Sequence, residues 1–193
     1  LSSPSSPSTI LVAGSDCTLV GATVPGYTVD IVGRSAFSHA TCIVPANLTN
    51  HATIRLSTAD AGYSSQLIVN AGATLTNGSD GTILAAAGAS PIRYINGSLV
   101  NDGTIATESG ATCVANGAFV QQGGSITAAG KWQLDSGSFT ITGGTSSGNV
   151  YCSGATISIE DTVTTASTLL VESAGNTLIQ HDSPAVTLTI QGN

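Results

Sequence analysis

Residues 71–90 read AGATLTNGSDGTILAAAGAS, and residues 96–115 read NGSLVNDGTIATESGATCVA. Both contain Leu-x-Asn followed closely by Gly-Thr-Ile, as LTNGSDGTI at 75–83 and LVNDGTI at 99–105. Short apolar-polar alternating runs, separated by Gly, Asn, Asp and Ser, then recur about every 20 residues to Asn193. A fixed period of this kind indicates one supersecondary unit stacked on copies of itself, and we predict the turns of a β-solenoid.

The apolar residues of these runs alternate with polar ones, as in Phe139 and Ile141 or Ile157 and Ile159. Alternation puts such side chains on one face of a strand, where successive turns stack them into a narrow core. No segment shows a capped helical stripe. We therefore predict an all-β, single-domain parallel β-helix. The alternative is a β-sandwich, which also has short strands at regular spacing.

Composition divides the chain into a short leader and one domain. Residues 1–8, LSSPSSPS, form a Ser/Pro-rich N-terminal segment, and 9–193 form the predicted solenoid, less regular over 9–65 and regular over 66–193. Only 8% of the 193 residues are charged, Ser and Thr supply roughly a quarter, and 23 are Gly. We expect a hydroxyl-rich surface.

The net charge of -7 and the four cations Arg34, Arg55, Arg93 and Lys131 leave no basic patch for nucleic acid. No apolar run is long enough for a membrane-spanning helix, so we expect no membrane insertion. The first residue is Leu1 rather than Met, which fits a mature secreted product or an excised fragment.

The repeats over 65–193 resemble the β-helical repeats of secreted adhesins and surface proteins, including bacterial haemagglutinin-type passengers and fungal cell-wall adhesins. This resemblance implies a β-helix and an extracellular, cell-surface role. It carries over no site residue.

Residues with catalytic potential are scattered through the chain. Glycosidases need two carboxylates at a set separation, but the only adjacent acids are Glu160 and Asp161, which would point to opposite faces of a strand. His39, His51 and His181 form no metal-binding motif. The serine-nucleophile pattern GTSSG at 144–148 precedes another strand rather than a helix. We expect neither an enzyme nor a cofactor, with a polysaccharide lyase or hydrolase the less favoured reading.

Four cysteines, Cys17, Cys42, Cys113 and Cys152, suit two disulfides in a secreted chain. Among three connectivities we favour Cys17 with Cys42 and Cys113 with Cys152. The second pair carries a conflict, because turns of about 20 residues would set Cys113 and Cys152 about two turns apart, beyond the reach of a disulfide.

Three further features concern the surface. Sequons for N-glycosylation occur at Asn47, Asn77 and Asn96, of which Asn77 and Asn96 read as exposed turns. Thr pairs at 140/142, 162/164 and 187/189 could form an ice-binding array, although outward Thr is also simply a good strand residue. Trp132 could stack on a sugar, but a single Trp more often packs in a core or an interface.

No cap helix is evident at either end of the predicted solenoid, and strand edges left open favour pairing with another chain. We therefore expect a non-enzymatic extracellular structural subunit that self-associates head to tail into a homopolymeric fibre or surface layer. The expected assembly residues are Thr9, Ile10, Leu11, Val12, Val186, Leu188 and Ile190. The alternative is a monomeric adhesin that binds cell-surface glycans.

Overall fold

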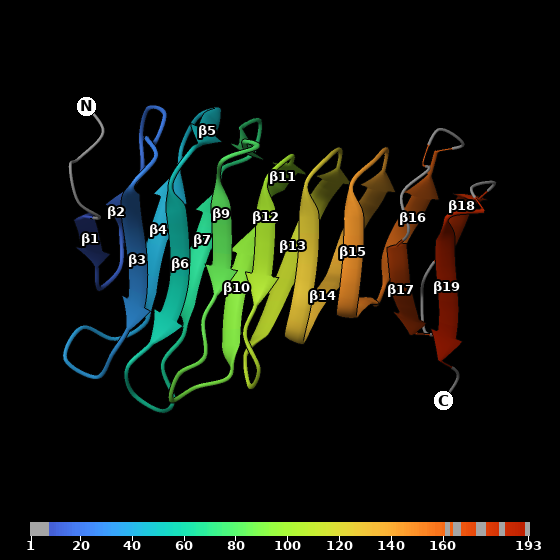
Figure 1. The fold of residues 1–193 in the computed structure, drawn as a ribbon. Coiled ribbons are helices and arrows are strands. Elements are labelled where there is room, and N and C mark those ends of the chain that lie inside the picture. The colour runs from blue at the N-terminus through green and yellow to red at the C-terminus, as the bar shows by residue number, and fades with distance from the viewer. Residues whose placement is uncertain (1–7, 161–162, 164–166, 173–176, 182–183, 192–193) are drawn as a thin grey trace.

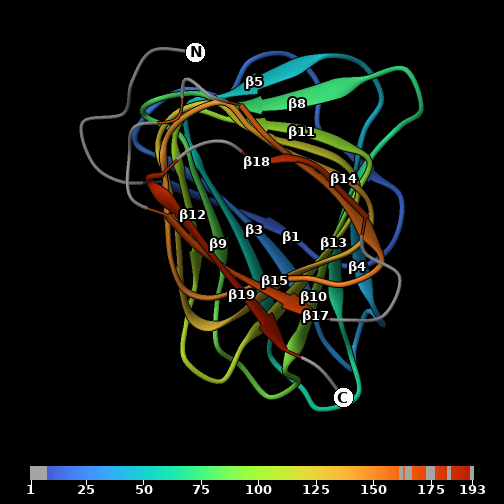
Figure 2. The ribbon, with the colours of Figure 1, turned by 90° about the vertical axis from the view of Figure 1, so that its right-hand side faces the viewer.

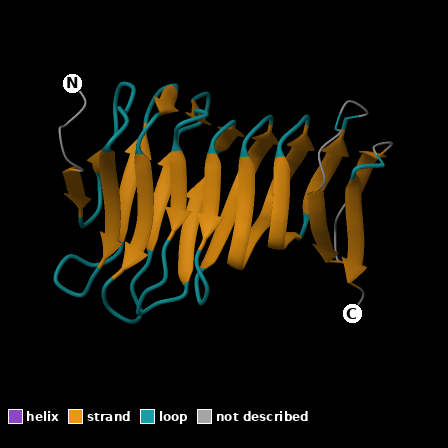
Figure 3. Cartoon of the chain, viewed as in Figure 1, coloured by secondary structure: helices purple, strands orange, loops and turns teal. Residues whose placement is uncertain are grey.

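The computed structural model describes residues 8–160, 163, 167–172, 177–181 and 184–191. These residues form a stack of strands that runs from left to right in Figure 1, with the first and last described strands at opposite ends of the molecule. The described residues contain strands and loops and no helix (Figure 3). Every pairing between the named strands is parallel; one isolated antiparallel bridge joins Arg34 and Ser38. The predicted parallel β-helix is confirmed, and the β-sandwich alternative is wrong.

The strands form three faces around one interior (Figure 2). Face A contains β1 (Ser8–Val12), β3 (Tyr27–Gly33), β6 (Thr53–Thr58), β9 (Thr82–Ala85), β12 (Thr104–Thr107) and the first parts of β14 (Ser125–Ile141) and β15 (Thr145–Cys152). Face B contains β2 (Cys17–Thr18), β4 (Ala40–Val44), β7 (Ser65–Val69), β10 (Ile92–Asn96), the first part of β13 (Thr112–Gln121), the middle of β14 and the last part of β15.

Face C contains β5 (Leu48–Asn50), β8 (Thr74–Asn77), β11 (Ser98–Asn101), the last parts of β13 and β14, β16 (Ala155–Ile159) and β18 (Thr177–His181). At the C-terminal end, β17 (Ser167–Glu172) pairs with β15, and β19 (Val186–Gln191) pairs with β17. Face A and these two strands therefore stack nine levels in the order β1, β3, β6, β9, β12, β14, β15, β17 and β19.

The core consists of inward side chains stacked level on level. In face A, an aliphatic column runs through Val29, Ile54, Ile83, Ile105 and Ile126, each 3% exposed or less. The column forms because every second residue of a strand points inward and the strands are in register. One residue of slip would turn a whole strand's apolar set outward, so this column fixes the register.

Aromatic side chains fill the middle of the core. Phe119 lies 4.9 Å from Trp132 and 5.0 Å from Phe139 between ring centroids, and the rings are tilted by about 50° as aromatic pairs prefer. Trp132 is completely buried. It is a packing residue, so it offers no surface for stacking on a sugar.

The corner between faces C and A contains a buried ladder of amides. Asn50 Nδ2 donates to Asn77 Oδ1 at 2.8 Å, Asn77 Nδ2 to Asn101 Oδ1 at 2.8 Å, and Asn101 Nδ2 to Gln121 Oε1 at 3.0 Å. All four side chains are at most 1% exposed. The steps of the ladder span 27, 24 and 20 residues, so the turns shorten toward the predicted length in the second half of the chain.

Candidate functional site: the open N-terminal end

The first turn of the solenoid ends in strand edges. Among the described residues, β1 pairs with β3 alone and β2 pairs with β4 alone. One long edge of each strand therefore presents backbone N–H and C=O groups that no described strand covers. Such an edge is a ready template for another strand of the same direction.

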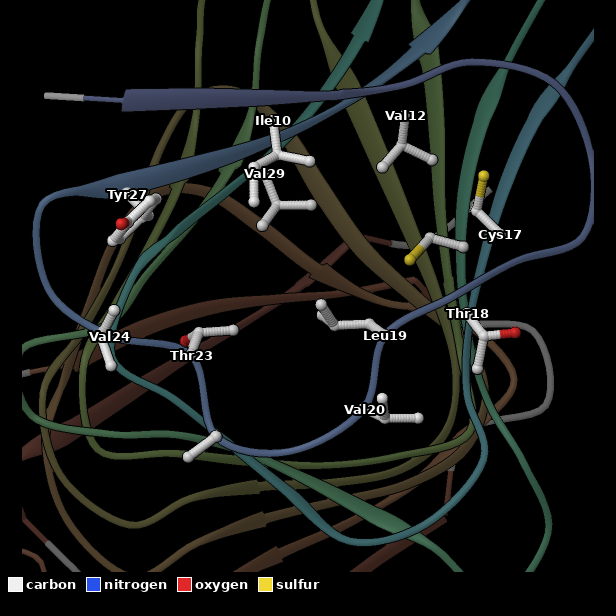
Figure 4. A pocket seen from close by; sticks show the side chains of 12 residues that line it. Ile10, Val12, Cys17, Thr18, Leu19, Val20, Thr23, Val24, Tyr27 and Val29 are labelled. Carbon is white, nitrogen blue, oxygen red and sulfur yellow. The ribbon is translucent and has the colours of Figure 1, made fainter. Parts of the chain in front are cut away.

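A cavity of about 310 Å³ opens at this end, at the point where the inward columns of the core stop. Figure 4 shows Ile10, Val12 and Val29 on one side of the cavity and Leu19 and Val20 on the other. The remaining lining residues are Cys17, Thr18, Ala22, Thr23, Val24, Tyr27 and Cys42. The lining is mostly apolar because these side chains form the last layer of the core.

Exposed apolar side chains gather at the same end. Ile10, Leu11 and Val20 are 50%, 54% and 71% exposed, and they make up three of the five large hydrophobic residues exposed in the described part of the chain. The other two are Phe37 and Ile92. Single exposed apolar residues are ordinary on a protein surface, so it is their gathering at one end that makes this end the candidate interaction surface.

The structure places the residues predicted for assembly at both ends. Thr9, Ile10 and Leu11 are exposed on β1, while Val12 is buried. At the far end, Val186 is 5% exposed, and β19 places the backbone of Leu188 and Ile190 opposite Leu169 and Val171 of β17. The side chains of Leu188 and Ile190 lie outside the described set. So does the Ser/Pro segment 1–8 apart from Ser8, which begins β1.

The predicted cysteine pairs meet two different outcomes. The structure contains no disulfide, and all four cysteines are thiols. Cys113 lies opposite Arg93 and Trp132, and Cys152 lies opposite Leu134 and Val171. Trp132 and its strand stand between them, so a Cys113–Cys152 bond does not fit this fold. Cys17, by contrast, lies directly opposite Cys42 on the next strand.

The three sequons differ in accessibility. Asn77 is completely buried, and its amide is engaged on both sides by the ladder. A glycan on Asn77 is incompatible with that arrangement, which corrects the expectation of an exposed turn. Asn96 is half-buried and accepts a hydrogen bond from Asn116 Nδ2 at 3.0 Å. Asn47 is exposed, with its Oδ1 accepting from the backbone N–H of Thr74.

The best candidate for chemistry is a polar groove of about 220 Å³ where His51 and Asp80 meet. His51 Nδ1 lies 2.6 Å from Asp80 Oδ1, and the hydrogen bond from His51 holds the pKa of Asp80 below its usual range. This pair is not evident from the sequence because 29 residues separate its members, although that spacing is about one turn. The groove lining contains one carboxylate, where glycosidase chemistry needs two.

A second polar groove, of about 280 Å³, lies on the outside of face A. Arg55 Nη1 donates to Asp30 Oδ2 at 2.7 Å, and Ser57 Oγ donates to Asp30 Oδ1 at 2.8 Å. The carboxylate of Asp30 therefore balances the positive charge of Arg55 within the fold. No group of three or more His, Cys, Asp or Glu side chains that could hold a metal ion occurs in the described part of the chain.

The GTSSG match proves to be part of a corner and a strand. Ser146, its central serine, is 5% exposed on β15, and its backbone N–H donates to Ser167 Oγ at 3.1 Å.

Of the acid pair, Glu160 is exposed and Asp161 lies outside the described residues. His39 Nδ1 lies 2.9 Å from Ser64 Oγ, and the side chain of His181 is outside the described set.

Hydroxyl side chains form an outward column, and its described members are not the Thr pairs at 140/142 and 187/189. Thr140 lies opposite Ser158 and Thr187 opposite Thr168, while residues 162 and 164 are outside the described set. The column instead occupies the first position of face A. Its members are Thr28, Thr53, Thr82, Thr104, Ser125 and Thr145.

Among the described residues, no helix is both long enough and apolar enough to cross a bilayer. Compared with family models, with curated proteins and with solved structures, the chain shows no significant match. Its function is therefore inferred from its own fold and surfaces.

Proposed function

We propose that this chain is a non-enzymatic, extracellular structural subunit that assembles head to tail into a fibre or surface layer. The observation that supports this most is the open N-terminal end. There, unpaired strand edges, an apolar cavity and the exposed side chains of Ile10 and Val20 lie together. Burying this surface would remove apolar area from water and satisfy backbone groups in the same step.

The occupant that suits this end is the last turn of a second copy. β1 and β2 are the open edges of faces A and B, and β19 is the last described strand on the opposite side of the same stack. Every pairing between successive levels is parallel, so β19 of one copy can add to β1 of the next in the parallel sense used within each face of the solenoid. Each added copy presents a new open end. The contact is therefore heterologous, does not close on itself, and produces a filament.

The surface composition fits an extracellular role. Only 8% of residues are charged, and hydroxyl side chains form a continuous outward column on face A. In a filament this hydroxyl-rich flank stays exposed along its length, where it could meet cell-surface glycans. We prefer self-association to glycan binding as the main function, because the open end supports a contact with a second copy.

Sedimentation at increasing protein concentration tests the proposal. We expect the wild-type chain to form species that grow with concentration, and we expect Ile10→Glu and Val20→Glu to remain monomeric because each places a charge in the apolar contact. Ile92→Glu is the matched control, since Ile92 is 36% exposed on β10, far from either end.

The control variant should assemble like the wild type. Wild-type monomers at every concentration would contradict the proposal, as would assembly that the Ile10 and Val20 variants leave intact.

A further inference from the structure

Cys17 and Cys42 face each other at the open end. They are register partners on β2 and β4, and both side chains line the terminal cavity. Parallel neighbours lie roughly 4.8 Å apart between strands, within the usual Cα separation of a disulfide. A bond needs the two Cβ atoms about 1 Å closer than that spacing. β2 is only two residues long and pairs with β4 alone among the described strands, so it can supply this movement.

The two thiols differ in access. Cys17 is half-buried, whereas Cys42 is 1% exposed. Burial, and secondly the neighbouring Cys17, raise the pKa of Cys42 to about 11. Tyr27 is the other titratable side chain that lines the cavity. An oxidant arriving from solvent therefore meets the sulfur of Cys17 first.

The other two cysteines are protected from the same chemistry. Cys113 and Cys152 are at most 1% exposed, and burial raises the pKa of each thiol to about 12. Thiolate character and access together control cysteine reactivity. The chain thus contains one accessible thiol, Cys17, with Cys42 as its register partner, and two buried cysteines that serve as internal controls.

We propose that Cys17 and Cys42 form a redox site that closes to a disulfide on reaction with a low-molecular-weight disulfide, and so ties the terminal turn of face B to the turn beside it. The Cys17 thiolate attacks the small disulfide, forms a mixed disulfide and releases one small thiolate. The Cys42 thiolate then attacks Cys17 Sγ and releases the second small thiolate. The two protein thiols lose two protons and two electrons, and the small disulfide is reduced to two thiols. This closure does not rest on head-to-tail assembly.

Incubation of the folded protein with glutathione disulfide tests this site. Remaining thiols are then blocked with N-ethylmaleimide, and the digested protein is analysed by mass spectrometry. We expect a peptide pair joined through Cys17 and Cys42, lighter by two hydrogens than the reduced pair. Cys113 and Cys152 should be unmodified under native conditions and fully modified after unfolding.

Two variants separate the steps. Cys42→Ser should stop at the mixed disulfide, with one glutathione on Cys17, and Cys113→Ser should close like the wild type. Because the second step needs the Cys42 thiolate, closure of the mixed disulfide should accelerate by about tenfold per pH unit below pH 11. Circular dichroism checks that each variant retains its strand content.

Three results would overturn the proposal. The wild-type protein could stop at the mixed disulfide at every pH, or an internal disulfide could include Cys113 or Cys152. In the third, Cys17 and Cys42 stay reduced in the folded protein while the unfolded chain reacts with glutathione disulfide.

Discussion

At the scale of single residues, the amide ladder explains what the repeated asparagines do. Asn50, Asn77 and Asn101 each occupy the same place in successive turns, and each gives its amide N–H to the next level. Buried amides are costly unless they are hydrogen-bonded, and here each polar group has a partner on a neighbouring turn. The ladder therefore fixes the register of face C as strictly as an apolar column does.

Replacing one member should expose this dependence. Asn77→Ala removes one acceptor of Asn50 Nδ2, which still donates to Ala52 O at 3.0 Å, and it takes away the side-chain donor that Asn101 Oδ1 accepts from. We expect a loss of about 2–4 kcal/mol in the free energy of unfolding. Urea titration measures the effect. The exposed Asn47→Ala serves as the control and should cost less than about 1 kcal/mol. Equal costs for the two variants would show that the ladder contributes nothing.

The recurring asparagines are visible in the sequence, but whether their side chains point inward or outward is not. Leu-x-Asn recurs in LTNGSDGTI and LVNDGTI, yet Asn77 before Gly also reads as an exposed turn with a glycosylation sequon. Only the register shows that Leu75 and Asn77 both point inward, because Leu75 stacks on Leu48 and Asn77 on Asn50. The same limitation hid the His51–Asp80 pair, whose contact depends on a 29-residue turn.

At the scale of elements, the corner between faces B and C depends on stacked glycines. Gly97, Gly117 and Gly137 lie in register and all have positive φ, at 109°, 122° and 103°. A Cβ on Gly117 would lie 2.4 Å from the carbonyl oxygen of Gly97. The long strands β13 and β14 can turn this corner because the chain there has no side chains to collide.

Gly117→Ala should therefore be far more costly than an alanine in an open turn. We expect a loss of at least about 3 kcal/mol, from backbone strain together with the collision. Gly110→Ala is the matched control, since Gly110 also has a positive φ of 81° but open space around it, and it should cost about 1 kcal/mol. Thermal or urea unfolding of the two variants measures the difference. Similar stabilities would contradict the role of close stacking.

The strands could be predicted because alternation and turn residues recur in the sequence, and turn counting also identified the conflict between Cys113 and Cys152. The pairing across turns could not be predicted in the first third of the chain. There, the ladder step from Asn50 to Asn77 spans 27 residues, against 20 from Asn101 to Gln121, so no single period aligns them. The same irregularity hid the hydroxyl column of face A, because its steps from Thr28 to Thr53 and from Thr53 to Thr82 span 25 and 29 residues.

At the scale of the whole molecule, the solenoid is a rod whose N-terminal end is unlike its sides. The flanks carry a column of hydroxyl side chains, while at the N-terminal end the exposed side chains of Ile10 and Val20 line an apolar cavity. A head-to-tail filament would cover this end and leave the flanks in contact with solvent. The Cys17–Cys42 pair lies at the same end, so its closure would stiffen the turn that receives the next copy.

Head-to-tail stacking of the subunits fixes the axial repeat of the filament. Nine strand levels at a spacing of roughly 4.8 Å give an axial repeat of about 43 Å per subunit when stacking continues without interruption into the next copy. Electron microscopy of the concentrated wild-type protein measures this repeat directly. Filaments with a subunit repeat of about 43 Å would support continuous stacking, whereas dispersed monomers, or filaments with an unrelated repeat, would contradict it.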